Sequence, residues 1–149
     1  LKTELNNTAH DQLVLLCTRL ARFKLENKEL LTYLLFESFD EQAFVEEVKK
    51  EMLGQFAMIN SNSLYFVKKS LRKILRQLNK YIRYSGIAET EVKLLLFFCS
   101  TLKKSGIAFE MHPVIKNMYQ AQFKKIKKTL ASLHEDLQYE YAKELNWLS

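Results

Sequence analysis

The sequence predicts an all-α fold, because helix-ending residues are scarce and apolar residues recur at helical spacing. The 149 residues include three glycines and one proline, the residues that tight β-hairpins and irregular loops require. Apolar residues make up 48% of the chain, enough for the core of a single domain over residues 1–149. We expect five or six helices in an antiparallel bundle or a short superhelical array, ending in a long C-terminal helix.

Cap residues divide the first part of the chain into four helices. The predicted caps are Thr8 (with Asp11 three residues on), Asn27, Asp40 and Ser63. The apolar positions that follow them predict helices ending near Phe23, Leu35, Ile59 and Tyr84. The break between the second and third helices could be only a kink.

The tetrapeptide Ser-Gly-Ile-Ala occurs twice, at residues 85–88 and 105–108, each time after a predicted helix end. Glycine just past a helix commonly adopts the left-handed conformation that stops it. We interpret the repeat as two similar helix stops, with a duplicated structural unit as the alternative. A fifth helix over residues 90–104 follows from this interpretation.

Pro113 suits the first turn of a last helix, whose apolar positions step by threes and fours to Leu148. That span is about 54 Å long at helical rise, whereas a domain of this size has a radius of gyration of about 15 Å. The helix therefore bends near Ala131 and Ser132 or overhangs the bundle. An overhanging apolar stripe would favour a homodimer through this helix.

The residues between Leu64 and Tyr84 include seven cations and no acid. Six of them fall within a sector of about 100° on a helical projection, opposite an apolar side. We call these six the basic stripe: Lys69, Arg72, Lys73, Arg76, Lys80 and Arg83. With Tyr65 and Tyr84 as possible stacking rings, the stripe has the composition of a nucleic-acid contact. A second basic cluster, Lys124, Lys125, Lys127 and Lys128, lies on the last helix.

Internal neutralisation by the protein's own acids, or simple solvation of the basic stripe, is favoured over nucleic-acid binding, since charged faces opposite apolar ones are usual on surface helices. Acidic residues are available in two segments: Glu37, Asp40, Glu41, Glu46, Glu47 and Glu51, and Glu135, Asp136, Glu140 and Glu144. A membrane-surface role is weaker, because the apolar side of the helix is needed for the core. No apolar run is long enough to cross a bilayer.

Signals for catalysis, cofactors and metals are poor. His10, His112 and His134 have no partner at metal-ligand spacing. Cys17 and Cys99 lie in apolar runs and are expected to be buried thiols, in keeping with a reducing cytoplasm. Phenylalanines at helical spacing are expected in the core, namely Phe36, Phe39, Phe44 and Phe56, and Trp147 is expected to anchor the end of the last helix.

Three stretches resemble an uncharacterised family of all-helical proteins from Bacteroidetes: Asn27–Glu37, Lys80–Ser85 and Leu133–Tyr139. The resemblance covers most of the chain. It implies a bacterial cytoplasmic protein and carries no activity, cofactor or site residue.

A non-enzymatic interaction scaffold for a protein partner, or for a second copy of the chain, is the function that the sequence favours. The alternative is a nucleic-acid-binding module that uses the basic stripe around residues 64–84. An enzyme comes third, because no catalytic, cofactor-binding or metal-ligating residues can be named.

Overall fold

The computed structural model describes residues 1–149 and consists of helices joined by turns, which confirms the all-α prediction. The chain divides into two compact units, Leu1–Phe39 and Asp40–Ser149. A single domain over the whole chain stays a prediction. None of the helices is both long and apolar enough to cross a lipid bilayer.

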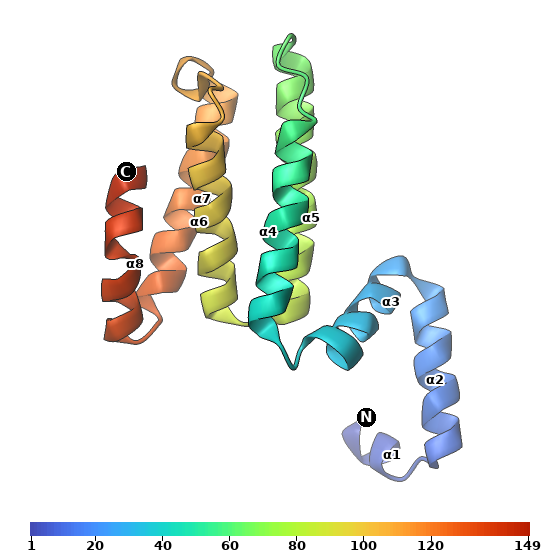
Figure 1. Ribbon diagram of the computed structural model, residues 1–149. Coiled ribbons are helices and arrows are strands. Elements are labelled where there is room, and N and C mark those ends of the chain that lie inside the picture. Colours follow the sequence, from blue (N-terminus) through green and yellow to red (C-terminus); the bar gives the residue numbers. More distant parts are fainter. The chain divides into compact units, whose positions relative to one another are not determined.

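The first unit contains three α-helices and one π-helical turn, drawn in blue in Figure 1. They are α1 (Lys2–Asn6), α2 (His10–Phe23), α3 (Leu25–Thr32) and the π-helical turn η1 (Tyr33–Glu37). The helices α2 and α3 contact each other. None of the residues in α1, α2 or α3 is buried, and Tyr33 is the one buried residue of the unit.

Two predicted caps in the first unit are wrong, because their side chains bond to the preceding helix instead. The Thr8 hydroxyl donates a hydrogen bond to the carbonyl of Glu4 (2.7 Å), so it closes α1, a helix that the sequence did not predict. Asn27 lies inside α3, and its amide donates to the carbonyl of Leu20 (2.8 Å) near the end of α2. Both side chains satisfy carbonyls that a helix end leaves without a partner.

The second unit contains five α-helices that run alternately in opposite directions (Figure 1). They are α4 (Glu41–Ala57), α5 (Leu64–Ser85), α6 (Ala88–Lys104), α7 (Pro113–Ala131) and α8 (Glu135–Leu148). A short 3₁₀ turn, η2 (Phe109–Met111), precedes α7.

Most helix boundaries of the second unit agree with the sequence prediction. Asp40 caps α4, where its carboxylate accepts a hydrogen bond from the Ala43 N–H (3.1 Å). Gly86 and Gly106 both have positive φ, as the interpretation of two helix stops requires. Pro113 occupies the first turn of α7. Ser63 precedes α5, although its side chain makes no capping hydrogen bond.

The predicted continuous last helix is wrong, because it breaks between α7 and α8 near the bend expected at Ala131 and Ser132. The break needs no glycine or proline, since side chains bond to the backbone there. The Ser132 hydroxyl donates to the Thr129 carbonyl, and the Gln138 amide donates to the Leu133 carbonyl (2.8 Å). The Nδ1 atom of His134 accepts from the Asp136 N–H and starts α8. The unbroken stripe on which the homodimer prediction depended is therefore absent.

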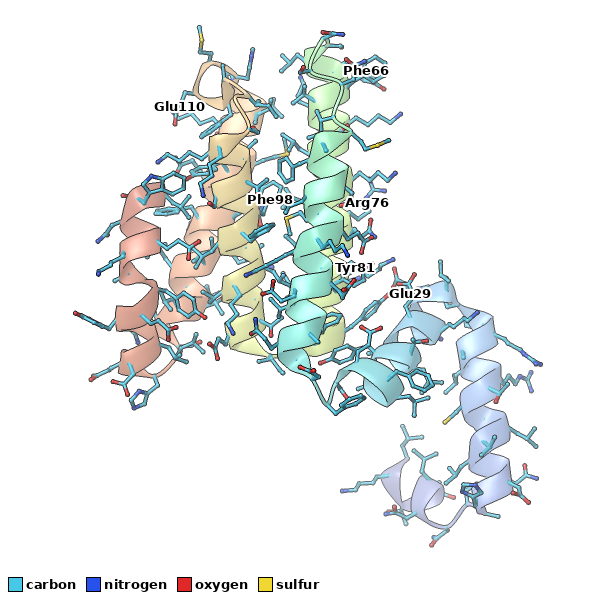
Figure 2. All side chains as sticks on the ribbon, viewed as in Figure 1. Glu29, Phe66, Arg76, Tyr81, Phe98 and Glu110 are labelled. Atoms are coloured by element: carbon cyan, nitrogen blue, oxygen red, sulfur yellow. The ribbon has the colours of Figure 1, made fainter.

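The core of the second unit surrounds α6, which contacts α4, α5, α7 and α8. Eight of its residues are buried, at positions around the helix: Thr90, Val92, Leu94, Leu95, Leu96, Phe98, Cys99 and Leu102. Phe98 is labelled in Figure 2, and its ring lies 5.7 Å from that of Phe56 on α4. A helix that is apolar on several sides in this way can only be stable at the centre of a bundle.

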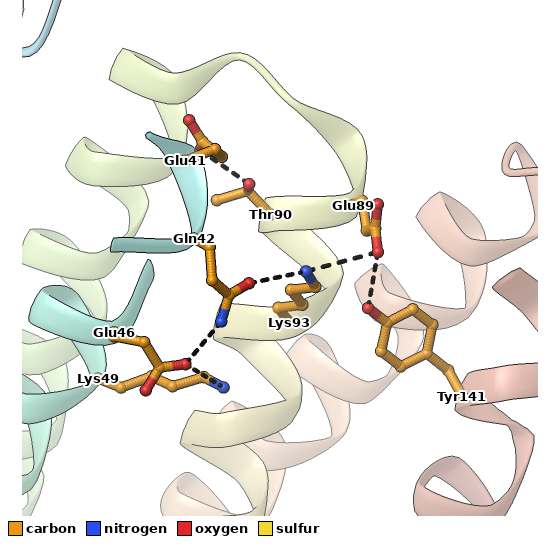
Figure 3. A network of polar contacts seen from close by, with 8 residues as sticks. All are labelled: Glu41, Gln42, Glu46, Lys49, Glu89, Thr90, Lys93 and Tyr141. Atoms are coloured by element: carbon orange, nitrogen blue, oxygen red, sulfur yellow. Dashed lines mark hydrogen bonds and ion pairs between the residues drawn. The ribbon is translucent and has the colours of Figure 1, made fainter. Parts of the chain in front are cut away.

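A chain of polar contacts joins α4, α6 and α8 at the edge of this core (Figure 3). Glu89 on α6 accepts a hydrogen bond from the Tyr141 hydroxyl (3.0 Å) and lies 3.5 Å from the Lys93 ammonium group. Lys93 also reaches the Gln42 carbonyl oxygen on α4, and Glu41 accepts from the Thr90 hydroxyl (2.8 Å). These contacts fix the rotation of the three helices about their own axes.

The predicted core residues divide between the two units. Phe44 is buried and Phe56 half-buried in the second unit, as predicted. Phe36, Phe39 and Cys17 are exposed, so their predicted burial is wrong. The reason is that they belong to residues 1–39, which lack a core of comparable size.

Replacing Leu95 by alanine should lower the free energy of unfolding of the second unit by about 2–5 kcal/mol, because the side chain is wholly buried and leaves a cavity. Urea unfolding of the full chain measures the change. Leu53→Ala on α4 is the control, since that leucine is half exposed and should cost much less. Equal losses for the two variants would contradict the central position of α6.

Candidate nucleic-acid interface

The helix α5 has two chemically different sides. Its buried residues are apolar apart from the Tyr84 hydroxyl: Val67, Leu71, Ile74, Leu75, Leu78, Ile82 and Tyr84. The basic stripe lies outside this set, with Lys80 half-buried and its other five cations exposed. Figure 2 shows Arg76, a member of the stripe, on the side of α5 away from α6. Packing against the core therefore orients the stripe toward solvent.

Five members of the basic stripe form no ion pair and no hydrogen bond with the protein: Lys69, Arg72, Lys73, Arg76 and Arg83. Three of the four acids of α4 are engaged elsewhere. Glu46 pairs with Lys49 at 3.8 Å, and Glu51 accepts hydrogen bonds from the side chains of Gln77 and Tyr81. Gln77 and Tyr81 lie on the side of α5 that faces α4, about 90° and 130° around the helix from the centre of the stripe.

The second acidic segment also leaves the stripe unneutralised. It belongs to α8, which contacts α6 and α7. In this segment the Asp136 carboxylate lies 3.4 Å from the Nδ1 atom of His134. Pairing with the protein's own acids, one of the two favoured alternatives, is therefore wrong for these five cations, whereas the other, a solvated charged face, agrees with their exposure.

The second basic cluster adjoins the stripe, a proximity that the sequence alone did not indicate. All four of its lysines are exposed on α7. The Lys125 ammonium group donates to the Asn79 side chain on α5 (3.2 Å) and lies 3.7 Å from a Glu91 carboxylate oxygen. Lys125 and Arg83 line the same open cleft of about 580 Å³. The positive surface of α5 thus continues onto α7.

The two tyrosines predicted to stack on bases differ in exposure. Tyr65 is 65% exposed near the start of α5, and its ring meets that of Phe66 edge to face at 5.4 Å. Tyr84 is only 8% exposed, so its predicted role as a stacking ring is wrong. Helical spacing does not explain the burial of Tyr84, because this residue lies about 160° around the helix from the buried Ile82, near the edge of the stripe. Its ring packs edge to face on that of Tyr81 at 6.3 Å.

The structure offers no activated nucleophile. Burial raises the pKa of the Cys99 thiol to about 12, so the thiolate is scarce near neutral pH. Burial also raises the pKa of Tyr119 to about 12. The pKa of Tyr141 is raised by burial and by its hydrogen bond to Glu89. No group of three or more His, Cys, Asp or Glu residues lies close enough together to hold a metal ion.

Comparison with protein-family models, with curated proteins and with solved structures gives no match to this chain.

In dilute solution at pH 8, a thiol reagent should label one cysteine of the native chain quickly and the other only after denaturation. Cys17 is the exposed thiol. Cys99 is buried and its raised pKa keeps it protonated until the solution is strongly alkaline. Counting released chromophore per chain, with and without denaturant, checks this. Rapid labelling of native Cys17→Ser would contradict the burial of Cys99.

Proposed function

We propose that this chain is a nucleic-acid-binding module that holds the phosphate backbone on α5. The observation that carries the proposal is that five exposed cations of the basic stripe have no partner within the protein. From Lys69 to Arg83 the stripe extends about 21 Å along the helix. That length corresponds to about six phosphates along one strand of a duplex, at 3.4 Å of helix axis each.

The stripe supplies two kinds of phosphate contact. Arg72, Arg76 and Arg83 carry planar guanidinium groups that can bind phosphate oxygens in pairs. Lys69 and Lys73 contribute point charges whose counterions are released on binding. Phosphate contacts position a nucleic acid without reading its sequence, so we expect weak sequence preference. The exposed ring of Tyr65 could stack on an unpaired base at one end.

The formal charge supports the same choice of partner. Residues 1–39 contain five Lys or Arg and five Asp or Glu, so the net charge of +6 lies entirely in residues 40–149. A positive field concentrated on one unit steers polyanions toward it.

An interaction scaffold is the second candidate, and it is favoured by a different observation. Large apolar side chains are exposed along α2, among them Leu16, Leu20 and Phe23. An exposed apolar patch of this kind commonly marks a protein-binding surface. The two candidates use different units of the chain and are compatible.

Replacing Arg72 and Arg76 together by glutamate should abolish binding to single-stranded RNA and to duplex DNA at low salt. The reason is that two phosphate contacts are lost and two repulsive charges are introduced in the middle of the stripe. Fluorescence anisotropy of labelled oligonucleotides with the full chain measures the effect.

The double variant Arg19→Glu/Arg22→Glu is the matched control. It changes the net charge by the same amount on exposed positions of α2. Binding that survives in this control and is lost in the α5 variant supports a local contact. Wild-type protein that fails to bind either probe at low salt would refute the proposal.

The logarithm of the binding constant for duplex DNA should fall with the logarithm of salt concentration at a slope of about −4 to −5, which corresponds to about five phosphate contacts. Replacing Arg83 alone by glutamine should make that slope shallower by about one. Titrations at several salt concentrations give both values. A slope near zero would show that the stripe does not contact phosphates.

A further inference from the structure

The open cleft of the second unit lies at one end of the basic stripe. It has a volume of about 580 Å³ and lies among the end of α5, the start of α6 and α7. Arg83, the last cation of the stripe, lines the cleft, and Lys125 reaches it from α7. Arg83 is exposed and forms no ion pair or hydrogen bond with the protein. A strand that follows the stripe along α5 would therefore meet this cleft.

The cleft differs from the rest of the stripe because its lining includes an acid. Glu91 on α6 lines it, with a side chain that is 20% exposed. Its Oε1 atom accepts a hydrogen bond from the Thr129 hydroxyl (3.0 Å) and lies 3.7 Å from the Lys125 ammonium group. These two contacts hold the carboxylate in place. The Oε2 atom forms no hydrogen bond with the protein, so it can accept one from a ligand.

The other polar side chains of the cleft are hydrogen-bond donors. Arg83 and Lys125 carry positive charges, and Asn79 adds an amide. An ammonium group only donates, so the oxygen of the Asn79 amide is the atom that faces Lys125, at 3.2 Å. The Nδ2 donor of Asn79 forms no hydrogen bond with the protein. Donors and an available acceptor therefore line the same cleft.

This combination fits a ligand in which an anion and a hydroxyl donor lie close together. The two cations and one carboxylate of the cleft leave one positive charge, which balances one phosphodiester group. A phosphodiester cannot bond to Glu91, because both groups only accept. A ribose 2′-hydroxyl can, since it donates as well as accepts and lies on the sugar next to the phosphate. Ile87, which is 43% exposed in the lining, offers apolar contact to the sugar.

We propose that this cleft binds one ribonucleotide of an RNA strand, with its phosphate on Arg83 and Lys125 and its 2′-hydroxyl on Glu91. The assignment rests on the proposed function, because the strand in the cleft is the one that the basic stripe binds. It adds a preference that phosphate contacts alone do not give, namely RNA over DNA.

Three single-stranded probes of one sequence test the assignment: RNA, DNA and 2′-fluoro RNA. Fluorescence anisotropy with the full chain at low salt gives the three dissociation constants. RNA should bind on the order of tenfold more tightly than DNA, since a hydrogen bond to a charged group contributes at least about that factor. The 2′-fluoro probe should bind like DNA, because fluorine leaves no hydroxyl proton for Glu91 to accept.

Glu91→Ala and Glu46→Ala form a matched pair of variants. Both remove one negative charge from an acid that lies close to a lysine, at 3.7 Å and 3.8 Å respectively. Glu46 belongs to α4 and does not line the cleft. Glu91→Ala should bind RNA and DNA with equal affinity, whereas Glu46→Ala should keep the preference for RNA. Circular dichroism verifies that both variants remain helical, and the comparison of the three probes with the wild-type chain needs no variant.

The possible failures of this assignment and of the proposed function are distinguishable. Equal affinity of the wild-type chain for RNA and DNA overturns the ribonucleotide site and leaves nucleic-acid binding intact. A preference for RNA that persists with the 2′-fluoro probe or in Glu91→Ala also overturns it, because the preference would then arise from sugar conformation or another contact. A wild-type chain that binds none of the three probes refutes both.

Discussion

Burial of α6 is the interaction on which the rest of the second unit depends. Its apolar residues face four other helices, and Leu95, Phe98 and Leu102 are fully buried. Because the core lies around this helix, α5 can bury only the side that carries Leu71 and Leu78. The opposite side must remain at the surface, and that side carries the basic stripe. The position of the candidate interface is thus a consequence of how the core is packed.

The two units differ in how they could be stabilised. Residues 40–149 bury a continuous apolar core and reinforce it with polar contacts such as the one between Glu89 and Tyr141. Residues 1–39 instead leave the apolar face of α2 in contact with solvent. The two units also differ in their surfaces. The net positive charge belongs to residues 40–149, whereas the exposed apolar face belongs to residues 1–39.

Sequence patterns predicted features that depend on local chemistry. Helix boundaries were predicted correctly at Gly86, Asp40 and Pro113. Each of these residues determines the boundary by its own backbone conformation or by a contact within one helical turn. Thr8 and Asn27 failed as cap predictions because their side chains bond to an earlier helix. The basic stripe was visible as a pattern, but tertiary contacts decide which of its cations are paired, and five of the six form no ion pair. The burial of Tyr84 and the proximity of Lys125 to Asn79 likewise depend on tertiary packing. Helical periodicity in the sequence could not predict them.

Hydrogen exchange of the full chain tests most directly whether the two units are stabilised differently. The account predicts that amides of α6 exchange slowest, since they open only when the core unfolds. Amides of α2 and α3 should exchange much faster, because Tyr33 is the one buried residue of residues 1–39. Exchange in α2 and α3 that is as slow as in α6 would contradict the account.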